Sequence, residues 1–235
     1  MVMITKHYST EVNLQKVNPQ DYGVNLKITP SYGDDTIYGN DFDNTIDGLW
    51  GNDKIYGKGG MDVLYGGKGD DFIYGGDDFD IIHGGDDQDE IYGKNGNDSL
   101  FGDSGNDYLD GGFGNDYLFG GNGFDCLYGN DGNDLLYGGS LNDNLWGGDG
   151  LDILHGNTGD DMLNGGNGDD WLYGDSGNDS LFGKDGDDFL FGNDGDDYLK
   201  GGSGNDYLNG GYGNDKYITS GDHPLHNYGH DVIHD

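Results

Sequence analysis

An uninterrupted repeat of nine residues constrains this 235-residue chain more than any other feature. Stepping by nine from Asp35 to Asp215 reaches 21 positions, of which 20 are aspartate and one is Asn44. Two residues after each position stands leucine or isoleucine, with Tyr217 as the exception, and glycine follows two residues after each of these aliphatic residues, from Gly39 to Gly210. A unit this short cannot bury its single apolar residue alone, so the fixed register predicts stacked repeats rather than a globule.

The other columns of the nonapeptide also have a physical meaning. We number the glycine as position 1, which makes the aspartate position 6 and the aliphatic residue position 8. Position 4 is glycine in 17 of 21 repeats, and Phe42, Asp78, Asp87 and Leu141 are the departures. Position 2 is mostly Gly, Asn, Asp or Lys, which indicates a left-handed backbone. We therefore expect a tight turn at positions 1–6 and a three-residue strand at positions 7–9.

The single inward aliphatic residue of each repeat predicts the fold class. Stacked strands turn these residues into a continuous ladder, and the chain must coil to stack them. Two repeats then make one coil of turn, strand, turn and strand. The prediction is an all-β parallel β-solenoid of about ten coils, roughly 50 Å long at a strand spacing of ~4.8 Å.

Composition favours small cations as partners. The chain has 46 acidic against 10 basic residues, a formal charge of −36, and only 32% hydrophobic residues. Such a balance is typical of disorder unless the fold has its own supply of cations. The acidic surface argues against nucleic acid and anionic lipid as partners. We find no transmembrane segment and no cleavable signal peptide, and the lone Cys126 excludes an intrachain disulfide.

At this point a resemblance can be named. The segments 66–74 and 111–119 read GGKGDDFIY and GGFGNDYLF. They resemble the consensus G-G-x-G-x-D-x-U-x of the RTX (repeats-in-toxin) calcium-binding family. The resemblance implies a right-handed parallel β-roll, in which each calcium ion lies between successive turns on the same edge. Asp71 would then pair with Asp89 and Asp116 with Asp134, giving at most 19 ions.

The resemblance assigns the position-6 aspartates as calcium ligands, together with backbone carbonyls of the adjoining turns. These aspartates are Asp35, Asp53, Asp62, Asp71, Asp80, Asp89, Asp98, Asp107, Asp116, Asp125, Asp134, Asp143, Asp152, Asp161, Asp170, Asp179, Asp188, Asp197, Asp206 and Asp215. Asn44 lacks the charge, and four turns lack the position-4 glycine. We expect weak or empty calcium positions at these four turns, since Asn44 lies in the turn of Phe42. A metal-free turn-capping role for the aspartates is the alternative, which repulsion between stacked carboxylates disfavours.

The outward columns of alternate repeats are rich in aromatic and aliphatic residues. One interpretation is that ladders of rings stabilise the strands themselves. The other is a docking face for another domain, a glycan or a second copy of the chain. The residues of this candidate binding face are Phe101, Phe119, Tyr137, Ile153, Trp171, Tyr173, Phe189 and Phe191.

The two ends of the chain depart from the repeat. We expect a non-repeat cap at 1–29, the RTX β-roll at 30–217 and a degenerate final repeat or cap at 218–235. Val12, Leu14, Val24, Leu26 and Ile28 alternate as in strands. Four histidines near the C-terminus either hold a transition metal or are ordinary surface residues. They are His223, His226, His230 and His234.

The expected function is calcium binding without catalysis, because no catalytic motif is present outside the repeat register. The resemblance implies type I secretion and folding on reaching calcium outside the cell. We therefore expect a secreted or surface structural or adhesive module, with a cell-surface glycan or protein as partner. The alternative is the calcium-binding portion of a larger type I-secreted toxin, protease or lipase.

Overall fold

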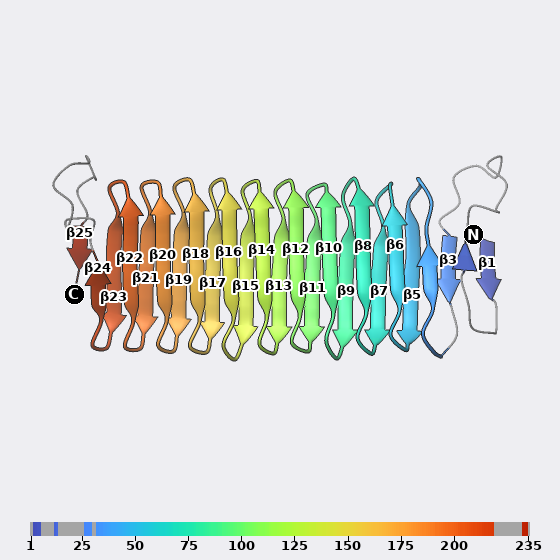
Figure 1. Cartoon of the computed structure of the whole chain (residues 1–235), viewed down its shortest axis with the longest axis horizontal. Helices are drawn as coiled ribbons and strands as arrows, with labels where there is room; N and C mark the ends of the chain where they lie inside the picture. Colours follow the sequence, from blue (N-terminus) through green and yellow to red (C-terminus); the bar gives the residue numbers. More distant parts are fainter. Residues whose placement is uncertain (1, 6–11, 14–25, 30–31, 219–231, 235) are drawn as a thin grey trace.

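The computed structural model describes residues 2–5, 12–13, 26–29, 32–218 and 232–234. These residues form two parallel sheets of 13 and 12 strands and no helix. The strands of the two sheets alternate along the chain and point in opposite directions, and they stack into one straight rod with the chain ends at opposite ends (Figure 1). The predicted all-β parallel solenoid is confirmed.

The 13-stranded sheet contains the odd-numbered strands. In order, they are β1 (Val2–Thr5), β3 (Leu26–Thr29), β5 (Asn44–Trp50), β7 (Val63–Lys68), β9 (Ile81–Asp86), β11 (Ser99–Ser104), β13 (Tyr117–Asn122), β15 (Leu135–Ser140), β17 (Ile153–Thr158), β19 (Trp171–Ser176), β21 (Phe189–Asp194), β23 (Tyr207–Tyr212) and β25 (Val232–His234).

The 12-stranded sheet contains the even-numbered strands. In order, they are β2 (Val12–Asn13), β4 (Thr36–Tyr38), β6 (Lys54–Lys58), β8 (Phe72–Asp77), β10 (Glu90–Asn95), β12 (Tyr108–Phe113), β14 (Cys126–Asp131), β16 (Asn144–Asp149), β18 (Met162–Asn167), β20 (Ser180–Asp185), β22 (Tyr198–Ser203) and β24 (Lys216–Ile218).

The register between neighbouring strands is constant through the repeats. Leu118 lies beside Leu136, and Leu136 beside Leu154, so paired residues are 18 apart in sequence. The register changes only at the ends, where Ile233 of β25 pairs with Leu208 and Ile4 of β1 pairs with Ile28. Segments from both expected caps therefore continue the sheets. Leu14 and Val24 lie outside the described residues.

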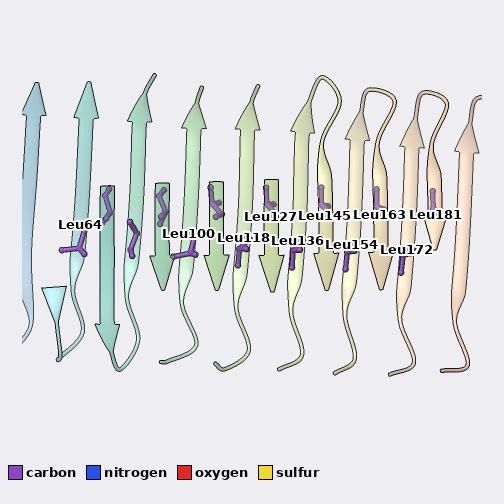
Figure 2. Close-up of a cluster of buried hydrophobic side chains, with 14 of the residues drawn as sticks. Leu64, Leu100, Leu118, Leu127, Leu136, Leu145, Leu154, Leu163, Leu172 and Leu181 are labelled. Carbon is purple, nitrogen blue, oxygen red and sulfur yellow. The ribbon is translucent and has the colours of Figure 1, made fainter. Parts of the chain in front are cut away.

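The core is a double ladder of one aliphatic residue per nonapeptide. All position-8 residues from Ile37 to Leu208 have no exposed surface. Figure 2 shows their side chains lying between the two rows of strands. Tyr217 ends the ladder at β24, where its ring packs partly buried against the core. Since each residue contacts only neighbouring coils, the core is one-dimensional.

The strands are longer than the sequence predicts. Most have six residues and cover positions 7–9 together with positions 1–3 of the next nonapeptide, as in β13 (Tyr117–Asn122). The expected turn at positions 1–6 is wrong, because position 1 is a buried, inward-facing strand residue and only positions 4–6 connect the strands. Positions 6, 8 and 1 all face inward, which is the two-residue period of a strand.

We predict that Leu136→Ala destabilises the folded chain by about 2–5 kcal/mol, because it leaves a cavity in a ladder that cannot collapse without disturbing two neighbouring coils. The adjacent Leu135 faces outward in the same strand and is only partly buried. Leu135→Ala should therefore cost less than about 1 kcal/mol. Urea-induced unfolding in calcium compares the two variants. Equal losses would contradict the assignment of inward and outward columns.

Candidate metal centre

The position-6 aspartates point into the solenoid rather than to solvent. From Asp35 to Asp206 their exposed fraction is between 0% and 4%, whereas Asp215 at the last turn is partly exposed. Each aspartate lies at an edge of the rod, just before the strand that carries the next core residue. Two columns of buried carboxylates therefore flank the aliphatic ladder, one along each edge.

One oxygen of each carboxylate joins successive coils. The backbone N–H of Asp71 donates to Oδ1 of Asp89 at 2.8 Å, and the N–H of Asp116 donates to Oδ1 of Asp134 at 2.7 Å. The same bond recurs at intervals of 18 residues from Asp35 to Asp215. The structure thus brings together the aspartate pairs that the resemblance implied, and holds them in register along each edge.

The second oxygen has no hydrogen-bond partner. From Asp53 to Asp197, in steps of nine, each Oδ2 atom is buried and accepts no hydrogen bond from the described residues. A buried carboxylate oxygen without a donor or a cation is costly. So regular a set of orphaned oxygens indicates that a positively charged group belongs beside them.

The position-1 glycines make room for these oxygens. A Cβ atom placed on Gly120 would lie 2.5 Å from Oδ2 of Asp125 and 2.6 Å from the carbonyl oxygen of Gly138. The same arrangement of a carboxylate oxygen and a glycine carbonyl oxygen from the next coil recurs along the rod, as at Gly66 and Gly147. One carboxylate oxygen and one carbonyl oxygen from successive coils therefore converge on a small volume that holds no side chain.

The donor set fits calcium. Calcium prefers six to eight oxygen ligands, mixes carboxylates with backbone carbonyls and tolerates irregular geometry. The site offers no nitrogen or sulfur ligand, and no cluster of three His, Cys, Asp or Glu side chains that could bind a metal occurs among the described residues. Turn carbonyls must therefore complete any coordination shell. The residues that would hold the ion are the paired position-6 aspartates and the glycines between them.

Burial leaves the carboxylates with a strong affinity for protons. Loss of solvent raises the pKa of Asp71 from 3.8 to about 7, while the hydrogen bond from Asp53 lowers it. The same burial raises the pKa of Asp89 to about 9 and that of Asp116 to about 6. Neighbouring aspartates add to the rise at Asp89. Without a cation, the folded chain must therefore take up protons near neutral pH.

The comparison with protein-family models agrees with this chemistry. The family model of the RTX calcium-binding nonapeptide repeat matches nine overlapping segments that together span residues 30–217. The chain belongs to this RTX repeat family. Among solved structures, a hyperactive, Ca2+-dependent, β-helical antifreeze protein from an Antarctic bacterium is similar at 23% identity and a TM-score of 0.39, covering 96% of this chain and 70% of that one. No curated protein matches.

The RTX turns that depart from the consensus differ from one another in the structure. Nδ2 of Asn44 donates to the carbonyl of Phe42 at 2.6 Å. The side chain at position 6 therefore contributes a hydrogen-bond donor to this turn, where the aspartate of the other repeats contributes only acceptor oxygens. Asp78, Asp87 and Leu141 keep the left-handed backbone, with φ between 75° and 82°. They therefore preserve the path of the turn at the cost of strain. Phe42 does not adopt a left-handed backbone. Weak calcium binding at these turns stays a prediction.

Position 5 of the RTX repeat has a role that sequence reasoning missed. The backbone N–H of Asn133 donates to Oδ1 of Asn115 at 2.7 Å, and the N–H of Leu151 donates to Oδ1 of Asn133 at 2.8 Å. These bonds run towards the preceding coil, opposite to the aspartate ladder. The available signal was the enrichment of Asn and Asp at this position. The left-handed backbone predicted for position 2 is present, as at Lys58 and Asn130.

Of the remaining candidate sites, the structure describes the binding face but not most of the histidine cluster. All residues of the candidate binding face lie on the outer side of the 13-stranded sheet, where Ile153 and Trp171 are 40% and 41% exposed. His223, His226 and His230 lie outside the described residues, so the histidine cluster stays untested. Among the described residues no helix is long and apolar enough to cross a bilayer.

We predict that Gly57→Ala weakens calcium binding and costs about 1–3 kcal/mol of stability, because its Cβ would lie 2.6 Å from the carbonyl oxygen of Gly75 and closer still to Oδ2 of Asp62. Gly59→Ala, two residues later in the same nonapeptide, is the matched control, since its nearest neighbours would lie at 3.8 and 3.9 Å. Calcium titration and urea unfolding measure both effects. Indistinguishable variants would show that the volume beside Asp62 is not needed.

We predict that acid stabilises the metal-free fold. The pKa of Asp53, Asp71 and Asp134 is raised by burial from 3.8 to about 7, so this contribution to stability is complete below pH 3.8 and is lost as pH rises through about 7. Metal-free protein should therefore gain β-structure between about pH 8 and about pH 5.5. Circular dichroism measures the gain, and light scattering excludes aggregation. An unchanged spectrum across this range would argue against buried carboxylates in the metal-free fold.

Proposed function

We propose that this chain is a calcium-dependent folding module that works outside the cell. Membership of the RTX family supports calcium binding, and the row of buried Oδ2 atoms without partners carries the assignment of the ligands. The proposed ligands are the position-6 aspartates from Asp35 to Asp215, with glycine carbonyls of the adjoining turns. In this proposal the chain winds as a right-handed roll with two nonapeptides per coil, as the 18-residue register supports.

The balance of charge explains why folding and binding are one process. The chain carries a formal charge of −36, and folding aligns its position-6 carboxylates in buried columns. Ions between successive turns on each edge number at most about 19 and bring up to +38, counted as two charges for each ion. The cation sites do not exist in the unfolded chain, so calcium binding supplies folding free energy. Low calcium in the cytosol then keeps the chain unfolded, and millimolar calcium outside folds it.

The biological role follows from this coupling. A chain that stays unfolded until it meets calcium suits export through type I secretion machinery. The folded rod presents long flat faces and no catalytic motif, so a structural or adhesive role at the cell surface fits it better than catalysis. A cell-surface glycan or protein is the proposed partner. Within this proposal, residues 30–217 form the working roll and the segments 1–29 and 218–235 cap its ends.

The test is a calcium titration of metal-free protein at neutral pH, followed by circular dichroism. We expect a cooperative gain of β-signal in calcium and little gain in magnesium, which demands a regular octahedral shell and gives up its water reluctantly. A chain that is fully folded in chelator at neutral pH would overturn the proposal.

Two variants that each remove one negative charge separate the ligand assignment from the overall charge. Asp116→Asn removes a buried ligand and should move the midpoint of the titration to higher calcium. Asp131→Asn changes an exposed residue and should leave the midpoint unchanged. Equal shifts in the two variants would show that total charge, rather than the position-6 column, controls folding.

A further inference from the structure

The outer side of the 13-stranded sheet is a long apolar face. We define the apolar face as the outward residues at positions 7, 9 and 2 of the ten odd-numbered strands from β5 to β23. Among these residues there is no lysine, and the acids are Asp47, Asp103 and Asp175. Asp103 and Asp175 each lie 3.0 Å from a histidine of the same face. On a chain of charge −36, this face is almost free of unpaired charge.

The opposite face of the rod is different. Of the seven lysines between residues 32 and 218, all but Lys68 lie on the 12-stranded sheet. Several of them cover rings there, as Lys94 does at 4.4 Å from the ring centre of Tyr92 and Lys184 does at 5.5 Å from that of Phe182. Charged side chains keep this face solvated. The two outer faces of the solenoid therefore differ in charge, and only the apolar face can be desolvated in an interface without burying lysines.

The packing of the rings limits what can cover the apolar face. His155 stacks between Tyr137 and Tyr173, with ring centres 4.9 and 4.5 Å apart and planes within 8° of parallel. Tyr173 stacks on Phe191 in the same way. Because the ring faces cover one another along the rod, the rings present their edges outward. A sugar needs an open ring face, so the apolar face does not fit a glycan. It fits another apolar surface.

The dimensions and spacing of the apolar face match a second copy of the chain. Ten strands at ~4.8 Å and three outward positions about 7 Å apart give roughly 650 Å² on each copy, or about 1,300 Å² buried in a pair. This area reaches the range of stable protein interfaces. The rows of side chains repeat at the strand spacing, so an identical partner presents matching rows along the whole length. A two-fold axis would join the two faces in one closed pair.

We infer that the folded chain forms a dimer by packing its apolar face against the apolar face of a second copy. Ile153 and Trp171 are paired neighbours on β17 and β19 and are among the most exposed large side chains of this face. Their position near the middle of the C-terminal half places them inside the interface. The inference concerns the outer surface only, and it does not depend on which residues bind calcium.

The experiment is sedimentation equilibrium of the full chain in saturating calcium over a range of concentrations. We expect a monomer–dimer equilibrium that is mostly dimer at about 100 µM. Ile153→Lys should raise the dissociation constant at least about tenfold, because it places a charge in a desolvated interface. Met162→Lys is the matched control, since Met162 occupies position 7 of the next nonapeptide on the opposite sheet. Circular dichroism confirms that both variants fold.

Each other outcome overturns the inference. A folded chain that stays monomeric at about 100 µM has no such interface. A dimer that Met162→Lys weakens and Ile153→Lys does not is formed by the other sheet. A dimer that resists both substitutions uses the ends or edges of the rod. Association that grows without limit is not the closed pair described here.

Discussion

The fold depends on how the second oxygen of each buried aspartate is neutralised. A carboxylate in this interior already uses Oδ1 to accept a hydrogen bond from the preceding coil, and its Oδ2 lies beside a glycine carbonyl of the following coil. Two facing acceptors repel unless a cation or a proton lies between them. The aliphatic ladder stabilises the interior, but it contributes one residue per nonapeptide and cannot offset a column of unneutralised charge on each edge. Cation supply therefore decides whether the remaining contacts can form.

The glycine at position 1 shows why residue type alone misleads. Glycine is usual in turns, so a repeat that begins with one or two glycines predicts a turn over positions 1–6. In the structure, Gly120 is a buried strand residue, and its missing side chain leaves space for the carboxylate of Asp125. The aliphatic column and the parallel stacking could be predicted, because strict periodicity fixes which residues meet, whereas the aspartate pairs were implied only by the resemblance to the RTX family. The inward direction of positions 1 and 6 could not be predicted, because it depends on how the turn is closed.

The direction of the two hydrogen-bond ladders also could not be predicted from the sequence. Asn115 and Asp116 are adjacent and chemically similar, yet the Oδ1 atom of Asn115 receives its bond from the following coil and that of Asp116 from the preceding one. The cause is the alternation of the chain, which sends one side chain outward and the next inward. Together the two ladders connect each coil to both neighbours through side chains as well as through the sheets. Such contacts fix the register in a structure whose coils are otherwise nearly interchangeable.

The register of 18 residues sets the unit by which a chain of this kind can change its length. Removal of 18 residues takes out one strand from each sheet and returns every later residue to its own face. Removal of a single nonapeptide keeps all the inward columns, because positions 6, 8 and 1 are the same in both sheets. It nevertheless moves every later strand to the other sheet. Trp171 would then lie on the face that carries the lysines, and Lys184 would lie within the aromatic row of the apolar face. Duplication and loss during evolution can therefore proceed in pairs of repeats without mixing the two surfaces, whereas an odd number leaves the interior intact and divides each surface in two.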